Sequence, residues 1–125
     1  MSNIIPSEVI IFGGAGFIGS NYAKYFIQNN FFSRIHLFDI ELKKIKLDHL
    51  IIHGIKQGKI TLKKVDIRKP IPSHNLKNIV LILNFAAIHR EPGHTPPEYF
   101  DTNILGAENV TGFAEKVNCN RVIFS

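Results

Sequence analysis

Three glycines spaced three residues apart follow directly on an apolar run near the start of the chain. The run is Val9 to Phe12, and Gly13, Gly16 and Gly19 come after it. Gly13 and Gly16 allow a tight turn that a ligand can approach closely, and Gly19 allows the following helix to pack against the strand. Since the N-terminus of a helix favours anions, the pattern predicts a turn that binds the pyrophosphate of a dinucleotide.

A carboxylate stands at the distance that such a site requires. The run Arg34–Asp39 predicts a second strand, whose last residue lies 20 positions after Gly19. Asp39 can accept hydrogen bonds from the adenosine ribose hydroxyls, and its charge would repel the additional phosphate of NADP. We therefore expect NAD as the cofactor, with Ile40 beside Asp39 in the same site. A helix N-cap is the alternative role for Asp39.

These residues need a frame of alternating helices and strands, and the rest of the chain predicts one. A first helix is indicated by Ile18, Tyr22, Tyr25 and Phe26 at helical spacing, before a stop at Asn29–Asn30. Further helices are expected over 41–53 and from Pro96 onward, and further strands over 60–65, 79–85 and 121–125. Five such strands predict an α/β, Rossmann-type doubly wound parallel sheet with strand order 3-2-1-4-5, truncated in the fifth strand.

Two helices and one strand carry predictions about their buried faces. The helix over 41–53 should turn Leu42, Ile45 and Leu50 inward and end at a Gly54 cap. Thr95, Pro96 and Glu98 form a helix start with a capping box. The apolar face of that last helix comprises Phe100, Ile104, Ala107, Thr111 and Ala114, flanked by Val110, Phe113 and Val117. The run 79–85 is typical of a strand covered on both faces.

Composition limits the classes of protein to which the chain can belong. Its 125 residues make one domain or part of one, and a hydrophobic content of 45% suffices for a modest core. The net charge of +5 includes lysines scattered along the chain without stacking aromatics, so nucleic acid is not an expected partner. No apolar run reaches the roughly 18 residues of a membrane span, and no basic leader precedes the first strand, so we expect a cytoplasmic protein.

Cysteine and histidine give little indication of redox or metal chemistry. Cys119 is the single cysteine, so an internal disulfide is impossible and a structural role is expected. His49 and His53 stand one helical turn apart, and His89 and His94 share a predicted loop. Neither pair has a third ligand in the sequence, and no metal site is expected.

The glycine pattern and three later motifs resemble the N-terminal part of the extended short-chain dehydrogenase/reductase superfamily, in particular its NAD-dependent epimerase/dehydratase branch acting on nucleotide sugars. The glycines match its signature together with Phe17 and Ile18, although Phe12 stands where threonine is usual. Three matches follow in the family's order: Asp66-Ile67-Arg68, Phe85-Ala86-Ala87, and Asn103 within the segment 103–107. The resemblance covers nearly the whole chain.

The resemblance implies a role for each motif. Asp66 and Ile67 would contact the adenine. The segment Phe85-Ala86-Ala87 would line the pyrophosphate and the nicotinamide ribose. The other members of the cofactor site would be Gly13, Gly16, Phe17, Ile18, Gly19 and Asn103. Taken singly, Asp66 can serve as a turn cap, Asn103 as a helix surface residue, and the two alanines as packing.

The loop after the fourth predicted strand, 88–94, should border the nicotinamide and face the substrate. The resemblance places His89 near the nicotinamide ribose, and Arg90 can meet a phosphate or carboxylate of the substrate. An exposed loop with neither role is the alternative.

The catalytic residues of the family have no counterpart in this sequence. In the family, a serine or threonine acts with a tyrosine four residues before a lysine, and these groups move the proton while hydride passes to the nicotinamide. None of the three tyrosines, Tyr22, Tyr25 and Tyr99, has a lysine four residues later. Ser125 resembles the first residue of the family's serine-rich stretch, a position that usually touches NAD.

We therefore expect residues 1–125 to be an incomplete NAD-binding Rossmann domain that lacks the tyrosine–lysine segment and the substrate domain. The function expected is the cofactor-binding part of an epimerase/dehydratase that works by hydride transfer at a sugar carbon, inactive by itself. The resemblance further implies a nucleotide-sugar substrate for the full-length enzyme. It also implies a homodimer through the helix starting near Pro96, supported by Phe100 and Phe113. The alternative is a non-catalytic NAD-binding or sensor module.

Overall fold

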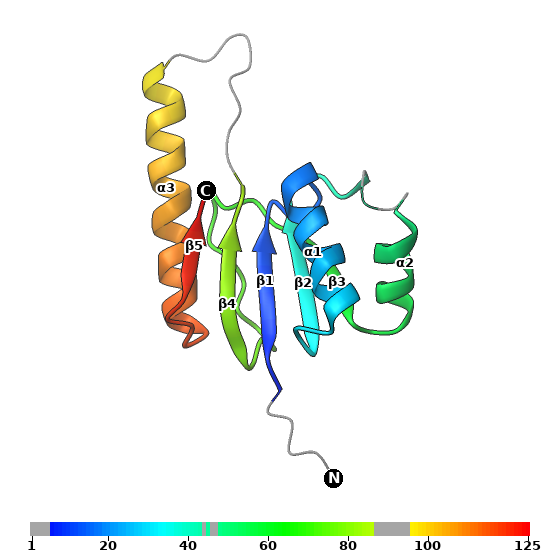
Figure 1. Ribbon diagram of the computed structural model, residues 1–125. Coiled ribbons are helices and arrows are strands. Elements are labelled where there is room, and N and C mark those ends of the chain that lie inside the picture. Colours follow the sequence, from blue (N-terminus) through cyan, green and yellow to red (C-terminus); the bar gives the residue numbers. More distant parts are fainter. Residues whose placement is uncertain (1–5, 44, 46–47, 87–95) are drawn as a thin grey trace.

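Over the residues that the structure describes, the chain folds into a parallel five-stranded sheet flanked by three helices (Figure 1). The computed structural model describes residues 6–43, 45, 48–86 and 96–125, the first seven of the last range by their backbone alone. The elements are β1 (Glu8–Phe12), α1 (Phe17–Asn29), β2 (Arg34–Asp39), α2 (His49–Lys56), β3 (Ile60–Lys64), β4 (Ile79–Asn84), α3 (Pro96–Lys116) and β5 (Val122–Phe124). The strand order β3-β2-β1-β4-β5 confirms the predicted Rossmann-type sheet.

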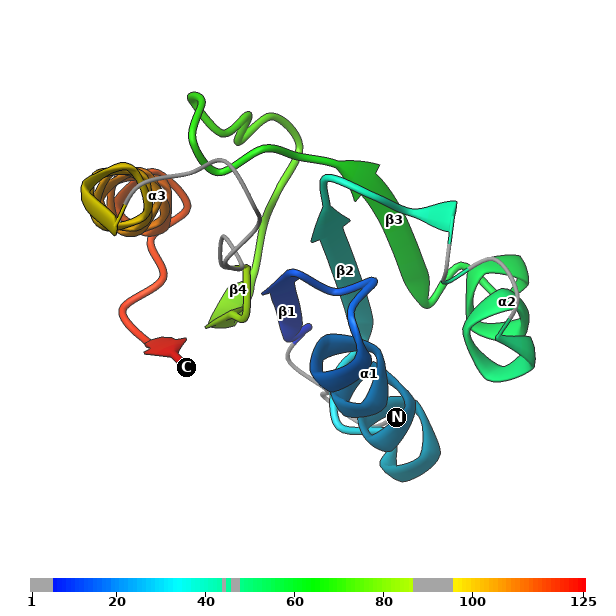
Figure 2. The same cartoon turned by 90° about the horizontal axis from the view of Figure 1, so that it is seen from above.

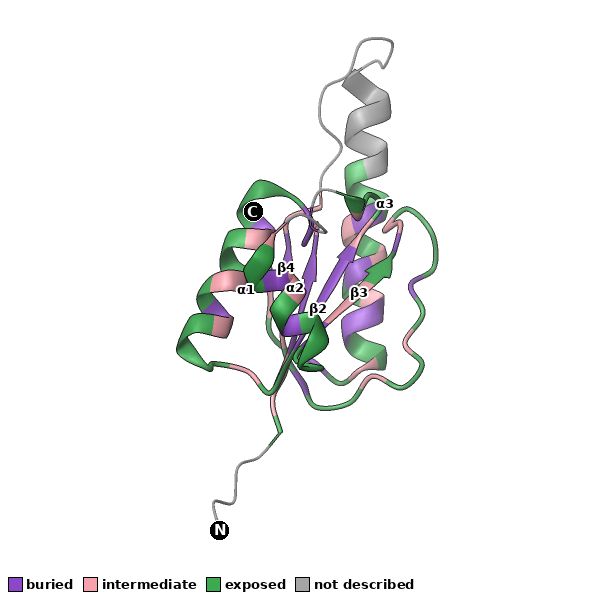
Figure 3. Ribbon diagram, turned by 90° about the vertical axis from the view of Figure 1, so that its right-hand side faces the viewer, coloured by how far each residue is buried: buried purple, intermediate pink, exposed green. Residues whose placement is uncertain are grey.

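The helices cover the two faces of the sheet separately (Figure 2). On one face, α1 and α2 pack over a cluster that includes Val9, Ile11 and Leu37. On the other face, α3 and the connection between β3 and β4 pack over a cluster that includes Ile10, Phe12 and Val110. Alternate residues of β1 therefore enter opposite clusters, as the two-residue period of a strand requires. Figure 3 shows the buried strands between the exposed outer faces of the helices.

Helix α1 begins and ends where the sequence predicts. Asn30 adopts a left-handed conformation (φ 53°) at the C-cap, and its amide donates to the last turn of the helix. Gly19, Ala23 and Phe26 form the buried face. Three other apolar residues of the predicted pattern lie on the exposed side of α1 next to Phe17: Ile18, Tyr22 and Tyr25. These four side chains are 45–84% exposed and line a hollow of about 420 Å³.

Helix α2 begins eight residues later than predicted, because its N-cap is Asp48. The Asp48 carboxylate accepts the amide of Ile51 at 3.2 Å and lies 3.1 Å from the ammonium of Lys24. Burial opposes ionisation of Asp48, but these contacts outweigh it and hold the pKa of the carboxyl below its ordinary 3.8. Gly54 is an interior residue rather than the expected cap, because α2 continues to Lys56 and its C-cap is Gln57. A Cβ at Gly54 would stand 2.5 Å from the Ile60 side chain.

The predicted inward residues of this region divide into two groups. Ile45 is buried and Leu42 is partly buried, but both precede α2. Leu50, in contrast, is 37% exposed, so its predicted inward orientation is wrong.

Helix α3 buries only part of the apolar surface that the sequence predicts for it. Val110, Phe113 and Ala114 are buried, whereas Ile104 is 43% exposed and Thr111 is exposed. Phe113 packs edge-on against Phe12, with ring centroids 5.6 Å apart, and this corrects its expected place in a dimer interface. Of the predicted helix start and apolar face, Thr95 lies outside the described residues, and Pro96, Glu98 and Phe100 are described by their backbone alone.

Strand β4 is not covered along its whole length. Val80 is 43% exposed, because a register shift in the pairing of β1 with β4 takes Glu8 to Ile79 and Val9 to Leu81, passing over Val80. The expectation that the run is covered on both faces is therefore wrong at this bulge.

A polar contact joins β1, β2 and β3 within the buried sheet. His36 is 5% exposed, its Nε2 lies 2.7 Å from the Glu8 carboxylate, and its Nδ1 lies 2.6 Å from the Thr61 hydroxyl. With Nε2 donating to the carboxylate, Nδ1 can accept from the hydroxyl, so both ring nitrogens are satisfied. Cys119 is also buried, with Sγ 3.4 Å from the Arg121 carbonyl, in agreement with a structural role. None of the helices described has the length and apolar content to cross a membrane.

Candidate cofactor site

The glycine turn lies at the carboxyl end of β1 and is tied to β2. The amides of Gly13 and Gly14 both donate to the Phe38 carbonyl, at 2.8 and 3.3 Å. Gly13 has a φ of +76°, a conformation that residues with a Cβ rarely adopt. The carboxyl ends of parallel strands are where open α/β sheets bind ligands, so the turn stands at the expected edge.

The three glycines of the motif have different surroundings. A Cβ at Gly13 would lie 2.7 Å from the backbone of Phe85 and Ala86, and one at Gly19 would lie 2.5 Å from the Gly13 carbonyl oxygen. Among the residues that the structure describes, a Cβ at Gly16 would meet only the Gly13 oxygen, at 3.3 Å. Gly13 and Gly19 are therefore required by the fold, whereas Gly16 keeps space clear at the start of α1.

The N-terminus of α1 suits an anion. Gly16 is the N-cap and offers no side-chain cap, and the first turn contains no acidic residue. The first amides of a helix have no acceptor within the helix and carry the positive end of its dipole. Gly16 places no side chain at this end of α1, and Phe17 and Ile18 next to it are exposed, an arrangement that favours an anion.

Asp39 at the end of β2 is joined to this turn. Its Oδ2 accepts the amide of Ala15 at 2.9 Å, and its Oδ1 accepts the amide of Glu41 at 3.1 Å. The alternative of a helix N-cap is wrong, because Asp48 caps α2. Each carboxylate oxygen can accept further hydrogen bonds, so Asp39 can hold the turn and still bind ribose hydroxyls. Ile40, next to it, is 50% exposed.

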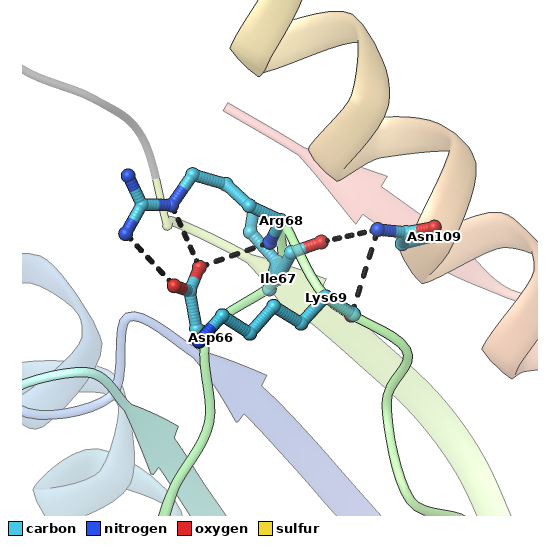
Figure 4. Close-up of polar contacts among 5 residues, drawn as sticks. All are labelled: Asp66, Ile67, Arg68, Lys69 and Asn109. Carbon is cyan, nitrogen blue, oxygen red and sulfur yellow. Dashed lines mark hydrogen bonds and ion pairs between the residues drawn. The ribbon is translucent and has the colours of Figure 1, made fainter.

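A tight turn follows β3 and contains the second predicted motif (Figure 4). The Arg68 guanidinium donates to both carboxylate oxygens of Asp66, at 2.9 and 2.8 Å, and the Arg68 amide donates to Oδ1 at 3.0 Å. The side-chain hydrogen bonds from Arg68 lower the pKa of the Asp66 carboxyl, and the same contact raises the pKa of Arg68. Asp66 is thus an ionised acceptor held in one orientation.

Asn109 on α3 fixes this turn from outside, and the sequence reasoning missed it. Its Nδ2 donates to the Ile67 carbonyl at 2.7 Å and lies 3.5 Å from the Lys69 carbonyl. The available signal was an amide directly before Val110, on the side of the helix that faces the sheet.

The ends of β4 and β5 complete the edge. The Phe85 amide donates to the Phe12 carbonyl at 2.9 Å, and the Ala86 amide donates to the side chain of Asn84 at 3.1 Å. The Ser125 amide donates to the Asn84 carbonyl at 3.3 Å. Asn84 is 6% exposed and was also missed, although an asparagine closing an apolar strand is a typical turn residue.

Phe85 and Ala86 therefore lie next to Gly13, and Ser125 lies one strand further along the same edge. Asn103 is an exposed residue of α3. Ala87, His89, Arg90 and His94 lie outside the described residues. Within the described ranges, no three histidine, cysteine, aspartate or glutamate side chains are grouped to hold a metal ion.

Two plant enzymes are similar to this chain over nearly its whole length. The chain is similar to the bifunctional UDP-glucose 4-epimerase and UDP-xylose 4-epimerase 1 of Pisum sativum, with 26% identity over 94% of its length. Enzyme 3 of the same description from Arabidopsis thaliana is 21% identical over the whole chain. The chain spans only 36% and 38% of the lengths of these relatives.

Solved structures show the same fold. Pen from Bacillus thuringiensis superposes with a TM-score of 0.70 and 22% identity, covering 98% of this chain and 38% of that one. UDP-glucose-4-epimerase from Stenotrophomonas maltophila was solved with NAD and formylated UDP-arabinopyranose. It superposes with a TM-score of 0.67 and 24% identity, covering 94% of this chain and 36% of that one. The model of the 3-beta hydroxysteroid dehydrogenase/isomerase family matches residues 10–125. The chain therefore belongs to that family, and the predicted resemblance to the extended short-chain dehydrogenases/reductases is confirmed.

Proposed function

We propose that this chain binds NAD and is the cofactor-binding part of a nucleotide-sugar epimerase or dehydratase that works by hydride transfer at a sugar carbon. The observation that carries the proposal is the glycine turn, in which Gly16 keeps the start of α1 clear and Asp39 is hydrogen-bonded to the Ala15 amide. The names of the plant relatives and the NAD-bound epimerase structure from Stenotrophomonas maltophila support the same cofactor and substrate class.

Each group on the edge has a task in holding the dinucleotide. The first turn of α1, beside Gly16, would receive the pyrophosphate, and Asp39 would accept the adenosine ribose hydroxyls. Asp66 and Ile67 would bind the adenine. Phe85 and Ala86, with Gly19 behind the turn, would line the pyrophosphate and the nicotinamide ribose, and Ala87, His89, Asn103 and Ser125 would extend toward the nicotinamide.

The chemistry of hydride acceptance and return belongs to the nicotinamide when it is bound. This chain's own residues would bind and orient the nicotinamide. They would not move the proton, because the sequence has no tyrosine followed four residues later by lysine. We therefore propose that residues 1–125 bind cofactor without turning over a sugar. Binding without any catalytic partner, as in a sensor module, is the alternative. The expected cytoplasmic location stays a prediction.

A homodimer through α3 is part of the proposal in a revised form. With Phe113 in the core, the described apolar side chains left on the outer side of α3 are Ile104 and Leu105, 43% and 45% exposed. These two residues replace Phe113 as the proposed contact.

Titration calorimetry of the 125-residue chain with NAD and with NADP tests the cofactor proposal. We expect NAD to bind and NADP to bind at least tenfold more weakly, because the Asp39 carboxylate faces the additional phosphate. Gly16→Ser should abolish NAD binding by filling the cleared space. Gly112→Ser on α3, where an added Cβ meets no described atom within 4 Å, is the matched control and should bind as the native chain does. Absence of NAD binding by the native chain, or equal binding by both variants, would refute the proposal.

A further inference from the structure

The turn Asp66–Lys69 is held by a side chain from a distant part of the chain (Figure 4). Asn109 of α3 donates through Nδ2 to the Ile67 carbonyl at 2.7 Å, a short and therefore well-formed hydrogen bond. The same nitrogen lies 3.5 Å from the Lys69 carbonyl, at the limit for a bond. Residues about 40 positions apart in the chain are joined by this single amide.

The peptide unit between Ile67 and Arg68 connects Asn109 to Asp66. This unit is planar, so its carbonyl and its N–H turn together. Asn109 holds the carbonyl end, and the Asp66 carboxylate accepts the N–H at the other end, at 3.0 Å. A rotation of this peptide would break both hydrogen bonds at once. The orientation of the Asp66 carboxylate is therefore coupled to the side chain of Asn109.

The backbone of α3 contacts the same turn one helical turn earlier. A Cβ at Gly106 would stand 2.7 Å from Cδ1 and 3.1 Å from Cγ1 of Ile67. Ile67 itself packs against the cluster on the α3 face of the sheet. Gly106 thus permits the close approach that brings Asn109 within reach of the carbonyl.

We propose that Asn109 is a positioning residue for adenine recognition, acting through the Ile67–Arg68 peptide and supported by the close contact at Gly106. The inference rests on the proposed NAD site. Arg68 and its amide occupy Asp66 from one side, with two donors on Oδ1 and one on Oδ2. Oδ2 can therefore accept more additional hydrogen bonds than Oδ1. The hydrogen bonds of Asn109 and Arg68 on either side of the Ile67–Arg68 peptide, which we call the clamp, fix the direction in which Oδ2 would accept a hydrogen bond from an adenine amine.

The test compares Asn109→Ala and Asn109→Asp with Glu108→Ala, a change at an exposed neighbour on the same helix. Asn109→Asp keeps the shape but replaces the donor by an acceptor that faces the Ile67 carbonyl. In the protein without nucleotide, hydrogen exchange of the Arg68 amide should accelerate about tenfold in both Asn109 variants, as expected for loss of one hydrogen bond. Glu108→Ala should exchange at the native rate.

Ligand binding separates positioning from a general loss of structure. ADP and NAD should bind roughly tenfold more weakly to Asn109→Ala, and still more weakly to Asn109→Asp. Inorganic pyrophosphate, which has no adenine, should bind all variants equally when followed by phosphorus NMR. A merely structural defect would weaken pyrophosphate as well, and that result would overturn the inference.

Gly106→Ala is a second variant that does not depend on removing a hydrogen bond. Alanine favours the helix, so thermal stability should not fall, yet displacement of Ile67 should weaken ADP binding. Unchanged Arg68 exchange in Asn109→Ala, or native ADP affinity in both Asn109→Ala and Gly106→Ala, would refute the clamp. Failure of the native chain to bind NAD would instead refute the proposed function and is recognised without any variant.

Discussion

Replacing Gly19 by alanine should destabilise the protein, whereas the same replacement at Gly112 should stabilise it. Both glycines lie inside helices, so both substitutions gain about 1 kcal/mol of helix propensity. At Gly112 none of the residues described by the structure comes within 4 Å of the added Cβ, so the gain is retained. At Gly19 the Cβ would stand 2.5 Å from the Gly13 oxygen and 2.9 Å from the Gly14 Cα. These are backbone atoms, so relief requires α1 to move away from the turn.

Overpacking of this kind costs roughly 3 kcal/mol at the upper end of its usual range, which leaves Gly19→Ala about 2 kcal/mol less stable than the native protein. The unfolding free energies of the two alanine variants should then differ by about 3 kcal/mol. This difference reports the cost of overpacking at Gly19, because the gain in helix propensity is the same in both variants and cancels. Urea unfolding followed by circular dichroism measures the difference directly. Equal changes in the unfolding free energy of the two variants would show that Gly19 is not in close contact with the turn.

Three further predictions concern the cap of α2, acid stability and the proposed dimer. Asp48→Ala should lower the free energy of unfolding by about 1 kcal/mol, and Asp48→Asn, which keeps the capping oxygen, by less; urea unfolding measures both. The lowered pKa values of Asp48 and Asp66 stabilise the fold above the ordinary value of 3.8. That contribution to stability should disappear as the pH falls through the lowered pKa values. Between about pH 6 and 2, the urea unfolding midpoint should therefore fall less in Asp66→Asn than in the native protein. Leu105→Lys should convert the proposed dimer to a monomer in light scattering; a native chain that is already monomeric contradicts the dimer.

The sheet could be predicted from sequence because its strands are short apolar runs bounded by turn residues. The helix boundaries followed where a local signal was strong, as at Asn30 and Pro96. The start of α2 was missed because the apolar positions of 42–50 have helical spacing, while the residue that begins the helix is Asp48, whose carboxylate caps it and also reaches Lys24 on α1. Such a choice depends on a neighbour that the local pattern does not contain.

The candidate site was predictable in its motifs and not in its supports. Gly13, Asp39 and Asp66 have a spacing set by the helices and strands between them, so the sequence locates them on one edge. Asn84 and Asn109 act by hydrogen bonds to backbone groups, and in Asn109 the acceptor lies about 40 residues away. A contact between residues so far apart in the chain is set by the tertiary fold. The sequence by itself shows only that a polar residue stands among apolar ones.

The order in which the molecule folds should follow from the two clusters on either face of the sheet. All buried members of the cluster under α1 and α2 except Leu83 come from residues 9–60, so this half can form through short connections. Strand β4 must then enter beside β1, closing a loop of about 70 residues, which is slow for entropic reasons.

Gly13 rests on Phe85 and Ala86, directly after β4, so the glycine turn, which is already hydrogen-bonded to Phe38 of β2, completes its packing only at this late step. We expect nucleotide affinity to appear after most of the helical signal during refolding. A fluorescent nucleotide that binds in the same phase as the helices form would contradict this order. The turn with the strongest sequence signature would then be one of the last parts of the protein to become functional.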